Sequence, residues 1–300
     1  MLKRLIIPGL AIAGLVAAGF GPTLQNFVPS AAAQTTTIHD ALQTGGQGRI
    51  SHVVDGDTVI LTDGRSVRLV GIQAPKLPLD RPNFKTWPMG EKAREELAVL
   101  ALVSPRPSSR EPSGTSFVTL AYGGQKIDRY GRALAHLYRH DPETGRQIWL
   151  QGEMLTRGLA RVYSFRDNRA LVPEMLALER SARGRGIGIW SLPFYSVRTA
   201  AQSKDHINNF GIVEDVVFQT AVVKGRTFLN FTDDWRSDFT VVIAPKNRRL
   251  FENAGVKLDS LAGQTIRVRG WIKNWNGPMI EIDHPEQLEI LTINQPESQS

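Results

Sequence analysis

The sequence of 300 residues contains no cysteine. This absence excludes disulfide bonds, thiol catalysis and zinc sites built on thiolates. It does not argue against export, because an oxidising compartment permits disulfides without requiring them. Histidine is also scarce, with six residues. His136 and His140 are four apart but lack a third partner, so we expect no metal site there.

A long apolar run stands near the N-terminus, at residues 5–20, directly after two cations. Three alanines at 31–33 follow, and together these features have the layout of a secretory signal peptide over residues 1–33. If cleavage does not occur, residues 5–28 would serve as a signal anchor in an inner membrane. Either outcome predicts export to the periplasm or the medium. Membrane association is expected only through the uncleaved segment.

The positive charge is concentrated in one part of the chain. The formal net charge is +7. Residues 48–196 carry 22 Lys and Arg against 15 Asp and Glu, whereas residues 210–291 carry 10 against 11. A basic first half is typical of a protein that binds a phosphate backbone, although a solvated basic face is the alternative.

Residues 53–76, VVDGDTVILTDGRSVRLVGIQAPK, form the most informative stretch. The pattern predicts three short strands, with Asp55 and Asp57 on the first turn and a hairpin at Asp63-Gly64. Arg68 begins the third apolar run. A carboxylate and a guanidinium on adjacent strands suit a phosphodiester, because the carboxylate can hold a metal and arginine can grip phosphate oxygens in two places.

This stretch resembles the staphylococcal nuclease family, whose pattern reads DGDT, then an RLxGIDAPE-like strand, then DxYGR. The third element is present as DRYGR at 128–132, and GLARVY at 158–163 and GIW at 188–190 fall in the expected order. The resemblance covers residues 48–196. It implies a five-stranded barrel of the OB type with three helices, DNA or RNA as the partner, and calcium as the cofactor.

The chain departs from this family at two of its three acidic positions. The resemblance assigns metal binding to Asp57, but Gln73 stands where the second metal ligand is expected and Lys76 stands where the catalytic Glu is expected. The two arginines that the family uses for phosphate and transition-state binding are retained as Arg68 and Arg132.

These exchanges change the charge that the site can hold. Calcium takes about 6–8 oxygen ligands and binds more tightly as carboxylates are added. One carboxylate, one amide and three cations instead form a positive pocket that attracts phosphate and repels a divalent ion. We therefore expect Lys76 to stand where the metal charge acted, and calcium binding to be weak or lost. Asp55 and Asp80 are the nearest candidates to rebuild a metal shell, and no other cofactor is expected.

Four further residues belong to the predicted site in supporting or binding roles. Thr58 follows Asp57 in the motif, Asp128 is expected to orient its turn, and Tyr130 is expected to pack on the barrel. Tyr163 is a candidate for contacting a base or a sugar, although a core or rim tyrosine is equally consistent with its position.

Periodicity predicts the remaining elements of the first domain. A helix is expected at 91–103, because its apolar residues fall on one face and Pro105 ends it. Strands are expected at 49–54, 115–122 and 132–139, a short helix ends at Gly158, and a second amphipathic helix is expected at 172–183.

A second unit is predicted at 210–292, after linkers at 34–47 and 197–209 and before a disordered tail at 293–300. Its elements follow the strand, strand, strand, helix, strand, strand order of an OB fold. The expected strands are 212–223, 227–230, 239–243, 265–273 and 279–282, with a helix at 245–253 and a short edge strand at 287–291.

Aromatic residues and cations interleave in this unit, as in single-strand binders. Its neutral-to-acidic charge balance favours a protein-contact role instead, so both alternatives stay open. The residues concerned are Phe231, Trp235, Trp271 and Trp275, with Arg267, Arg269 and Lys273.

The sequence thus predicts a mainly β protein of the α+β class, with a thermonuclease-like barrel followed by an OB-like barrel. The leading function is an exported protein that binds nucleic-acid phosphodiesters. Whether it also hydrolyses them is left open by the lost carboxylates. The alternative is a non-catalytic nucleic-acid-binding or protein-interaction module of the cell envelope.

Overall fold

The computed structural model describes residues 39–103, 117–141, 143–234 and 237–291. The predicted signal segment, residues 34–38 of the first linker, Trp235 and the tail at 293–300 lie outside these ranges. Contacts join the chain from Thr35 onward into one compact unit. Within the described ranges, no helix combines the length and the apolar character needed to cross a membrane.

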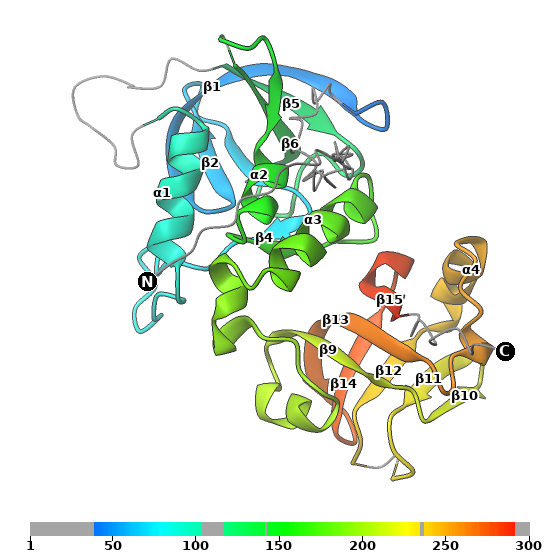
Figure 1. Cartoon of the computed structure of the whole chain (residues 1–300). Coiled ribbons are helices and arrows are strands. Elements are labelled where there is room, and N and C mark those ends of the chain that lie inside the picture. The colour runs from blue at the N-terminus through cyan, green and yellow to red at the C-terminus, as the bar shows by residue number, and fades with distance from the viewer. Residues whose placement is uncertain (1–38, 104–116, 142, 235–236, 292–300) are drawn as a thin grey trace, which may run out of the picture. The chain divides into compact units, whose positions relative to one another are not determined.

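The first half of the described chain is a closed β-barrel (Figure 1). Its strands follow the order β3-β2-β1-β5-β6-β7, and a parallel pairing of β3 with β6 closes the sheet on itself. Apolar residues alternate with polar ones along these strands, and the apolar side chains point inward and form one continuous core. The strands are β1 (Gln43–Asp55), β2 (Thr58–Leu61), β3 (Ser66–Leu69), β5 (Phe117–Tyr122), β6 (Ala133–His140) and β7 (Gln147–Trp149).

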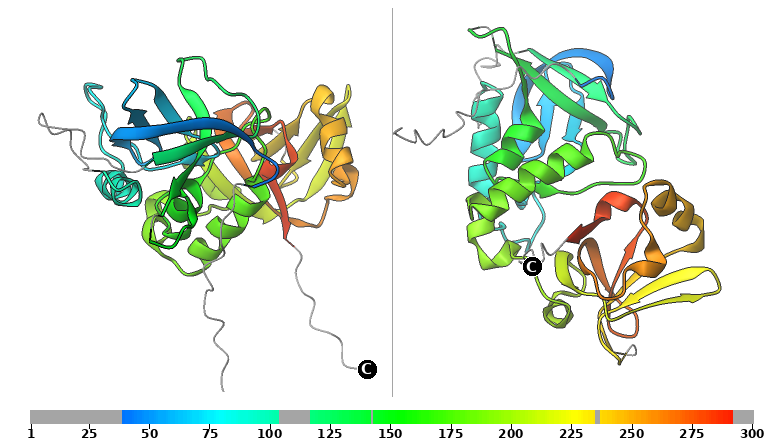
Figure 2. Two further views of the ribbon diagram at one scale, coloured as in Figure 1. Left: turned by 90° about the horizontal axis from the view of Figure 1, so that it is seen from above. Right: turned by 45° about the vertical axis from the view of Figure 1, so that its right-hand side comes forward.

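Three helices pack beside this barrel, as predicted (Figure 2). They are α1 (Gly90–Leu100), α2 (Leu150–Thr156) and α3 (Val172–Gly184). The apolar face predicted for the first helix is buried, because Ala93, Leu97 and Leu100 all lie in the core. A small two-stranded sheet of β4 (Ile72–Gln73) and β8 (Arg161–Val162) lies next to α3.

Two details differ from the predicted first domain. Strand β1 already begins at Gln43, inside the predicted linker, because Gln43 and Thr44 pair with the end of β5. The apolar run after Arg68 is not one strand, because Gly71 turns the backbone at a φ of +82° between β3 and β4. Only glycine adopts such a φ without strain, so the turn is encoded locally.

The second half contains a β-rich sheet with the predicted element order. The strand order is β10-β11-β12-β14-β13-β15, and β9 pairs with β13. The predicted strand 212–223 is interrupted at Val217 and Phe218, which separates β9 from β10. That this sheet is an OB fold stays a prediction. The elements are β9 (Phe210–Val216), β10 (Gln219–Val223), β11 (Arg226–Asn230), β12 (Thr240–Ile243), α4 (Pro245–Asn253), β13 (Thr265–Asn274), β14 (Pro278–Ile282) and β15 (Leu288–Leu291).

Short 3₁₀ helices connect these parts of the chain. The third of them occupies residues 201–206 of the predicted linker at 197–209. They are η1 (Gly188–Ser191), η2 (Pro193–Tyr195), η3 (Ala201–His206), η4 (Leu258–Ser260) and η5 (Pro285–Gln287).

Candidate phosphate-binding site

The turn between β1 and β2 holds the first part of the site. Gly56 is packed so closely that a Cβ atom there would lie 2.6 Å from the Cβ of Ala74 and 2.8 Å from that of Ala93. The glycine therefore lets the turn approach the segment that carries Ala74. As a result, the Ala74 amide donates a 2.7 Å hydrogen bond to Oδ2 of Asp57, which is completely buried.

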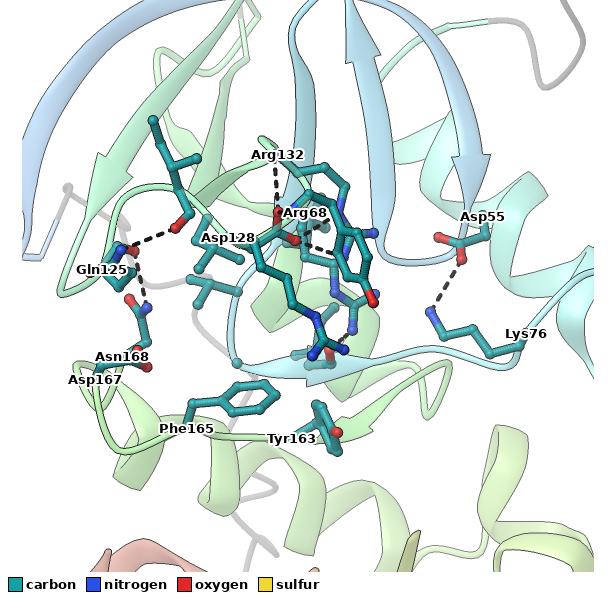
Figure 3. A pocket seen from close by; sticks show the side chains of 18 of the residues that line it. Asp55, Arg68, Lys76, Gln125, Asp128, Arg132, Tyr163, Phe165, Asp167 and Asn168 are labelled. Carbon is teal, nitrogen blue, oxygen red and sulfur yellow. Dashed lines mark hydrogen bonds and ion pairs between the residues drawn. The ribbon is translucent and has the colours of Figure 1, made fainter. Parts of the chain in front are cut away.

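Lys76 contacts both carboxylates of this turn, and Figure 3 shows its contact with Asp55. Its Nζ is 2.7 Å from both carboxylate oxygens of Asp57 and 3.2 Å from Oδ2 of Asp55. Burial lowers the pKa of Lys76 to about 7, with the charge of Arg68 acting in the same direction and Asp55 opposing it. The ammonium thus supplies a positive charge where both carboxylates converge.

Arg68 adds a second cation to the same carboxylate. Its Nη1 pairs with Oδ1 of Asp57, and its Nη2 donates a 3.0 Å hydrogen bond to the carbonyl of Ile72. Burial lowers the pKa of Arg68 to about 10, so the side chain stays charged at neutral pH. Thr58 donates a 3.2 Å hydrogen bond to Oδ1 of Asp57 as well. The predicted residues Asp55, Asp57, Arg68 and Lys76 are therefore brought together.

Arg132 reaches the site from the turn before β6. Its Nε and Nη2 both lie 2.8 Å from Oδ2 of Asp128, while Oδ1 of Asp128 accepts the amides of Tyr130 and Arg132. Asp128 therefore holds both the turn and the guanidinium. The described residues offer no partner to Nη1 of Arg132, and this nitrogen is available to a ligand.

These groups line a pocket of about 700 Å³ (Figure 3). Five cations and three acids line it, and the buried Asp57 that contacts Arg68 and Lys76 adds a fourth acid, so the local formal charge is +1. Apolar and aromatic side chains, including Tyr130, Tyr163 and Phe165, form the rest of the wall. A positive pocket with aromatic walls is suited to a phosphate joined to a sugar and a base. The charged residues are Arg68, Lys76, Arg81, Arg129 and Arg132 with Asp55, Asp128 and Asp167.

The two tyrosines occupy different positions on this wall. Tyr130 does not pack on the barrel, as the sequence predicted, but is 68% exposed, with the guanidinium carbons of Arg129 and Arg132 at 4.9 and 5.4 Å from its ring centre. Tyr163 packs edge-on against Phe165 and Phe210. Exposure of Tyr130 follows from its place at the tip of a tight turn, where no other element covers it.

The predicted supporting residue Gln73 and the candidate metal ligand Asp80 are directed elsewhere. The amide oxygen of Gln73 accepts hydrogen bonds of 2.9 and 2.6 Å from Nε and Nη2 of Arg161, and Gln73 is not among the residues that line the pocket. Asp80 is exposed, has a φ of 61°, and is also absent from the pocket wall. In the described residues, no group of three or more His, Cys, Asp or Glu side chains is placed to hold a metal ion.

Sequence reasoning missed Arg81 and Arg129 as members of the site. Arg129 stands inside the DRYGR motif, so its position next to Tyr130 was a usable signal. Arg81 lies in the proline-rich loop, where it donates a 2.6 Å hydrogen bond to the carbonyl of Leu77 and stacks on Phe84 at 3.8 Å. Only the folded loop brings this side chain to the pocket.

The predicted cation and aromatic platform of the second half does not form as one surface. Phe231 is buried against Phe239 at 5.1 Å. Arg267 pairs with Glu214 at 2.6 Å, and the buried Arg269 pairs with Glu179 at 3.0 Å. Trp271 and Trp275 are about half exposed, and Trp271 donates a 2.9 Å hydrogen bond from Nε1 to the hydroxyl of Tyr163.

Comparison with known proteins places the barrel among nucleases. Residues 66–192 match the model of the family described as "Staphylococcal nuclease homologue". The chain is 34% identical to "Protein ParB" of Escherichia coli over 155 residues, which span 49% of this chain and 73% of that protein. It is 30% identical to an "Uncharacterized endonuclease" of Escherichia coli O157:H7, over 48% of this chain and 76% of that protein.

A third relative is "Thermonuclease" of Staphylococcus hyicus, which is 27% identical over 48% of this chain and 75% of its own length. All three alignments cover about half of this chain, which is the length of one domain. From the motifs, the barrel and these similarities together, the chain belongs to the family of staphylococcal nuclease homologues.

Proposed function

We propose that this protein binds nucleic-acid phosphodiesters in the pocket of Arg68, Lys76 and Arg132, without calcium. The observation that carries the proposal is the contact of the Lys76 ammonium with both oxygens of Asp57. Membership of a nuclease family supports nucleic acid as the ligand class. The local formal charge of +1 supports an anionic ligand.

The donors in the pocket do not fit calcium. The Asp57 carboxylate already accepts hydrogen bonds from Lys76, Ala74 and Thr58 and pairs with Arg68. Asp55 accepts from Lys76 and from the amide of Asp57. A calcium ion needs about 6–8 oxygen ligands, so it would have to displace the ammonium and would still lack carboxylates.

The pocket residues divide the task of holding a phosphate. Arg132 is fixed by Asp128 and can direct its free Nη1 to a phosphate oxygen. Arg68 and Lys76 contribute charge from deeper in the pocket, where burial reduces screening by salt. Tyr163 and Phe165 offer ring faces and edges to the attached sugar or base.

Fluorescence anisotropy with a labelled oligonucleotide tests this proposal. The expected dissociation constant is the same in calcium and in a chelator, and Arg132→Ala raises it about tenfold, because one charged hydrogen bond contributes about 1.5–3 kcal/mol. Lys126→Ala serves as the control, because Lys126 is exposed and absent from the pocket wall. Binding that requires calcium would contradict the proposal.

Calcium-independent hydrolysis at the same pocket is the second candidate. It is favoured by the nuclease names of the relatives and by the presence of two arginines beside Lys76. In this reaction a water oxygen bonds to phosphorus, the P–O bond to the leaving sugar breaks, and Arg68 and Arg132 neutralise the developing charge. A cleavage assay in chelator with single-stranded and duplex substrates decides it. Binding without cleavage in every condition leaves the first proposal standing and rejects the second.

We also propose that the protein is exported. The support is the sequence of residues 1–33, with its cations, apolar run and alanines. Expression of the full chain, and of a variant without residues 1–33, in a bacterium followed by fractionation tests it. Full chain found only in the cytoplasm would contradict export.

A further inference from the structure

A second pocket, of about 680 Å³, shares no lining residue with the first. Its volume lies in the range of small-molecule sites. Four aromatic side chains line it, together with two arginines, one histidine and one acid. The aromatic residues are Trp87, Phe194, Phe210 and Trp271, and the charged or titratable residues are Arg161, Arg198, His206 and Asp205.

Arg161 is an unusual member of this second pocket, because it is only 5% exposed. Its Nε and Nη2 donate to Gln73, while the described residues give its Nη1 no partner. Within the described ranges no carboxylate lies at ion-pair distance from it, and burial lowers its pKa to about 10. A buried guanidinium without a counter-ion is costly, so an anion entering the pocket would offset that cost.

Gln73 explains why this arginine lacks a negative partner. The amide oxygen of Gln73 satisfies two N–H groups of Arg161 but brings no charge. A carboxylate at this position would neutralise the guanidinium. The residue that departs from the metal-binding pattern of the first pocket therefore leaves a positive charge in the second.

Side chains with π faces surround this positive charge. The guanidinium carbon of Arg161 lies 4.5 Å from the ring centre of Phe210 and 5.9 Å from that of Trp87. Phe194 and Trp271 are 46% and 48% exposed, so their rings are accessible to a ligand. Cations next to accessible aromatic rings form the usual site for an unpaired base and its phosphate.

The two pockets meet at one hydrogen-bonded pair of aromatic residues. Tyr163 lines the first pocket, Trp271 lines the second, and Nε1 of Trp271 donates to the hydroxyl of Tyr163 at 2.9 Å. Phe210 of the second pocket also packs edge-on against Tyr163, with ring centres 4.9 Å apart. A strand that crosses Tyr163 passes directly from one pocket to the other.

We propose that the second pocket binds a further nucleotide of the same single strand whose phosphodiester occupies the first pocket. The phosphate contacts Arg161 and Arg198, and the base stacks on Trp271 or Phe194. The strand must be single, because the faces of a base inside a duplex are covered by the bases stacked above and below it. This inference rests on the proposed function and specifies the ligand as a longer, single-stranded nucleic acid.

Anisotropy with two labelled single-stranded probes tests the inference, one of three nucleotides and one of about 12, a length that spans a typical single-strand site. Trp271→Ala should raise the dissociation constant of the longer probe about 5- to 150-fold and leave that of the trinucleotide unchanged. Arg198→Ala should act in the same direction. Trp271→Phe, which keeps a ring but loses the N–H group, should recover most of the affinity.

Trp275→Ala is the matched control, because Trp275 is 52% exposed, lies just beyond β13 and does not line the second pocket. A duplex of the same length should respond to Trp271→Ala less than twofold, and an equal loss on the duplex would overturn the single-strand assignment. Trp271→Ala and Arg198→Ala could change the dissociation constants no more than Trp275→Ala does, while Arg132→Ala weakens the binding of both probes. In that case the first pocket binds nucleic acid, but the second pocket is not a subsite. If Arg132→Ala affects neither probe, both proposals fail.

Discussion

The pocket of the barrel and strand β13 of the second sheet both place cations beside aromatic rings, but the two regions differ in how these cations are bonded. In the pocket, Arg132 keeps one guanidinium nitrogen without a partner among the described residues. On β13, Arg267 and Arg269 are paired with glutamates, and the side chain of Arg269 is only 2% exposed. The arginines of both regions pair with carboxylates, so the guanidinium nitrogens that remain without a partner, rather than the pattern of cations along a strand, decide which side chains can meet a ligand.

The largest effect is expected from removing the acid that holds Arg269. Glu179 is completely buried and accepts hydrogen bonds from Arg269, Arg183 and the amide of Val162. Glu179→Ala removes one carboxylate partner of the buried Arg269. This loss should lower the free energy of unfolding by about 3–5 kcal/mol. Urea denaturation followed by fluorescence measures this loss.

Glu286→Ala is the control for that measurement. Glu286 also pairs with an arginine, Arg169, but both side chains are partly exposed. The expected loss is about 1 kcal/mol. Equal losses in the two variants would show that the cations of β13 are not held by a buried network.

The second effect concerns calcium. In Lys76→Glu, the ammonium leaves Asp57 and a third carboxylate joins Asp55 and Asp57, so the donors fit a divalent ion. At a calcium concentration about 100 times the dissociation constant, the ion should stabilise this variant by about 2.7 kcal/mol. Thermal unfolding with calcium and with chelator measures the gain. Wild-type protein is expected to show no shift, and a similar shift in both proteins would contradict the proposed role of Lys76.

Salt dependence separates the two sets of arginines directly. Arg132→Ala should reduce the slope of log K against log salt by about 0.7 for a single-stranded probe, because one phosphate contact is lost. Arg267→Ala should leave the slope unchanged, because its guanidinium is only 12% exposed and is engaged by both Glu214 and Glu289. Anisotropy titrations at several salt concentrations decide this point. A reduced slope in the Arg267 variant would place the second sheet in contact with phosphate.

The smallest effect is a pH dependence. The pKa of Lys76 is about 7, well below its ordinary value, so the ammonium loses its proton as the pH rises from about 6 to 8. The positive charge favours phosphate binding, and affinity should therefore fall severalfold over this interval, or by about 1 kcal/mol. Lys76→Met, which has no titrating group, should bind with the same affinity at both pH values. An unchanged wild-type affinity would show that Lys76 does not act on the ligand.

Local patterns predicted most of the elements because they are encoded by neighbouring residues. The helix at 245–253 and the strands around it follow from periodicity and from Pro245 at the helix start. The strand at 212–223 was predicted without its interruption, because Val217 and Phe218 are apolar and carry no turn signal. The DGDT, RLVGI and DRYGR motifs likewise predicted Asp57, Arg68, Asp128 and Arg132 as members of the site.

Tertiary structure decided what those residues contact. The sequence by itself determined which side chains have the chemistry for phosphate, and its resemblance to the nuclease family predicted acids at the positions of Gln73 and Lys76. Only the folded chain directed Gln73 to Arg161, 88 positions away, and Trp271 to Tyr163, 108 positions away. The physical reason is that a charge is neutralised or left free by atoms within about 4 Å. Those atoms come from different segments of the chain, and the separation of two segments in the sequence does not determine how far apart they lie in space.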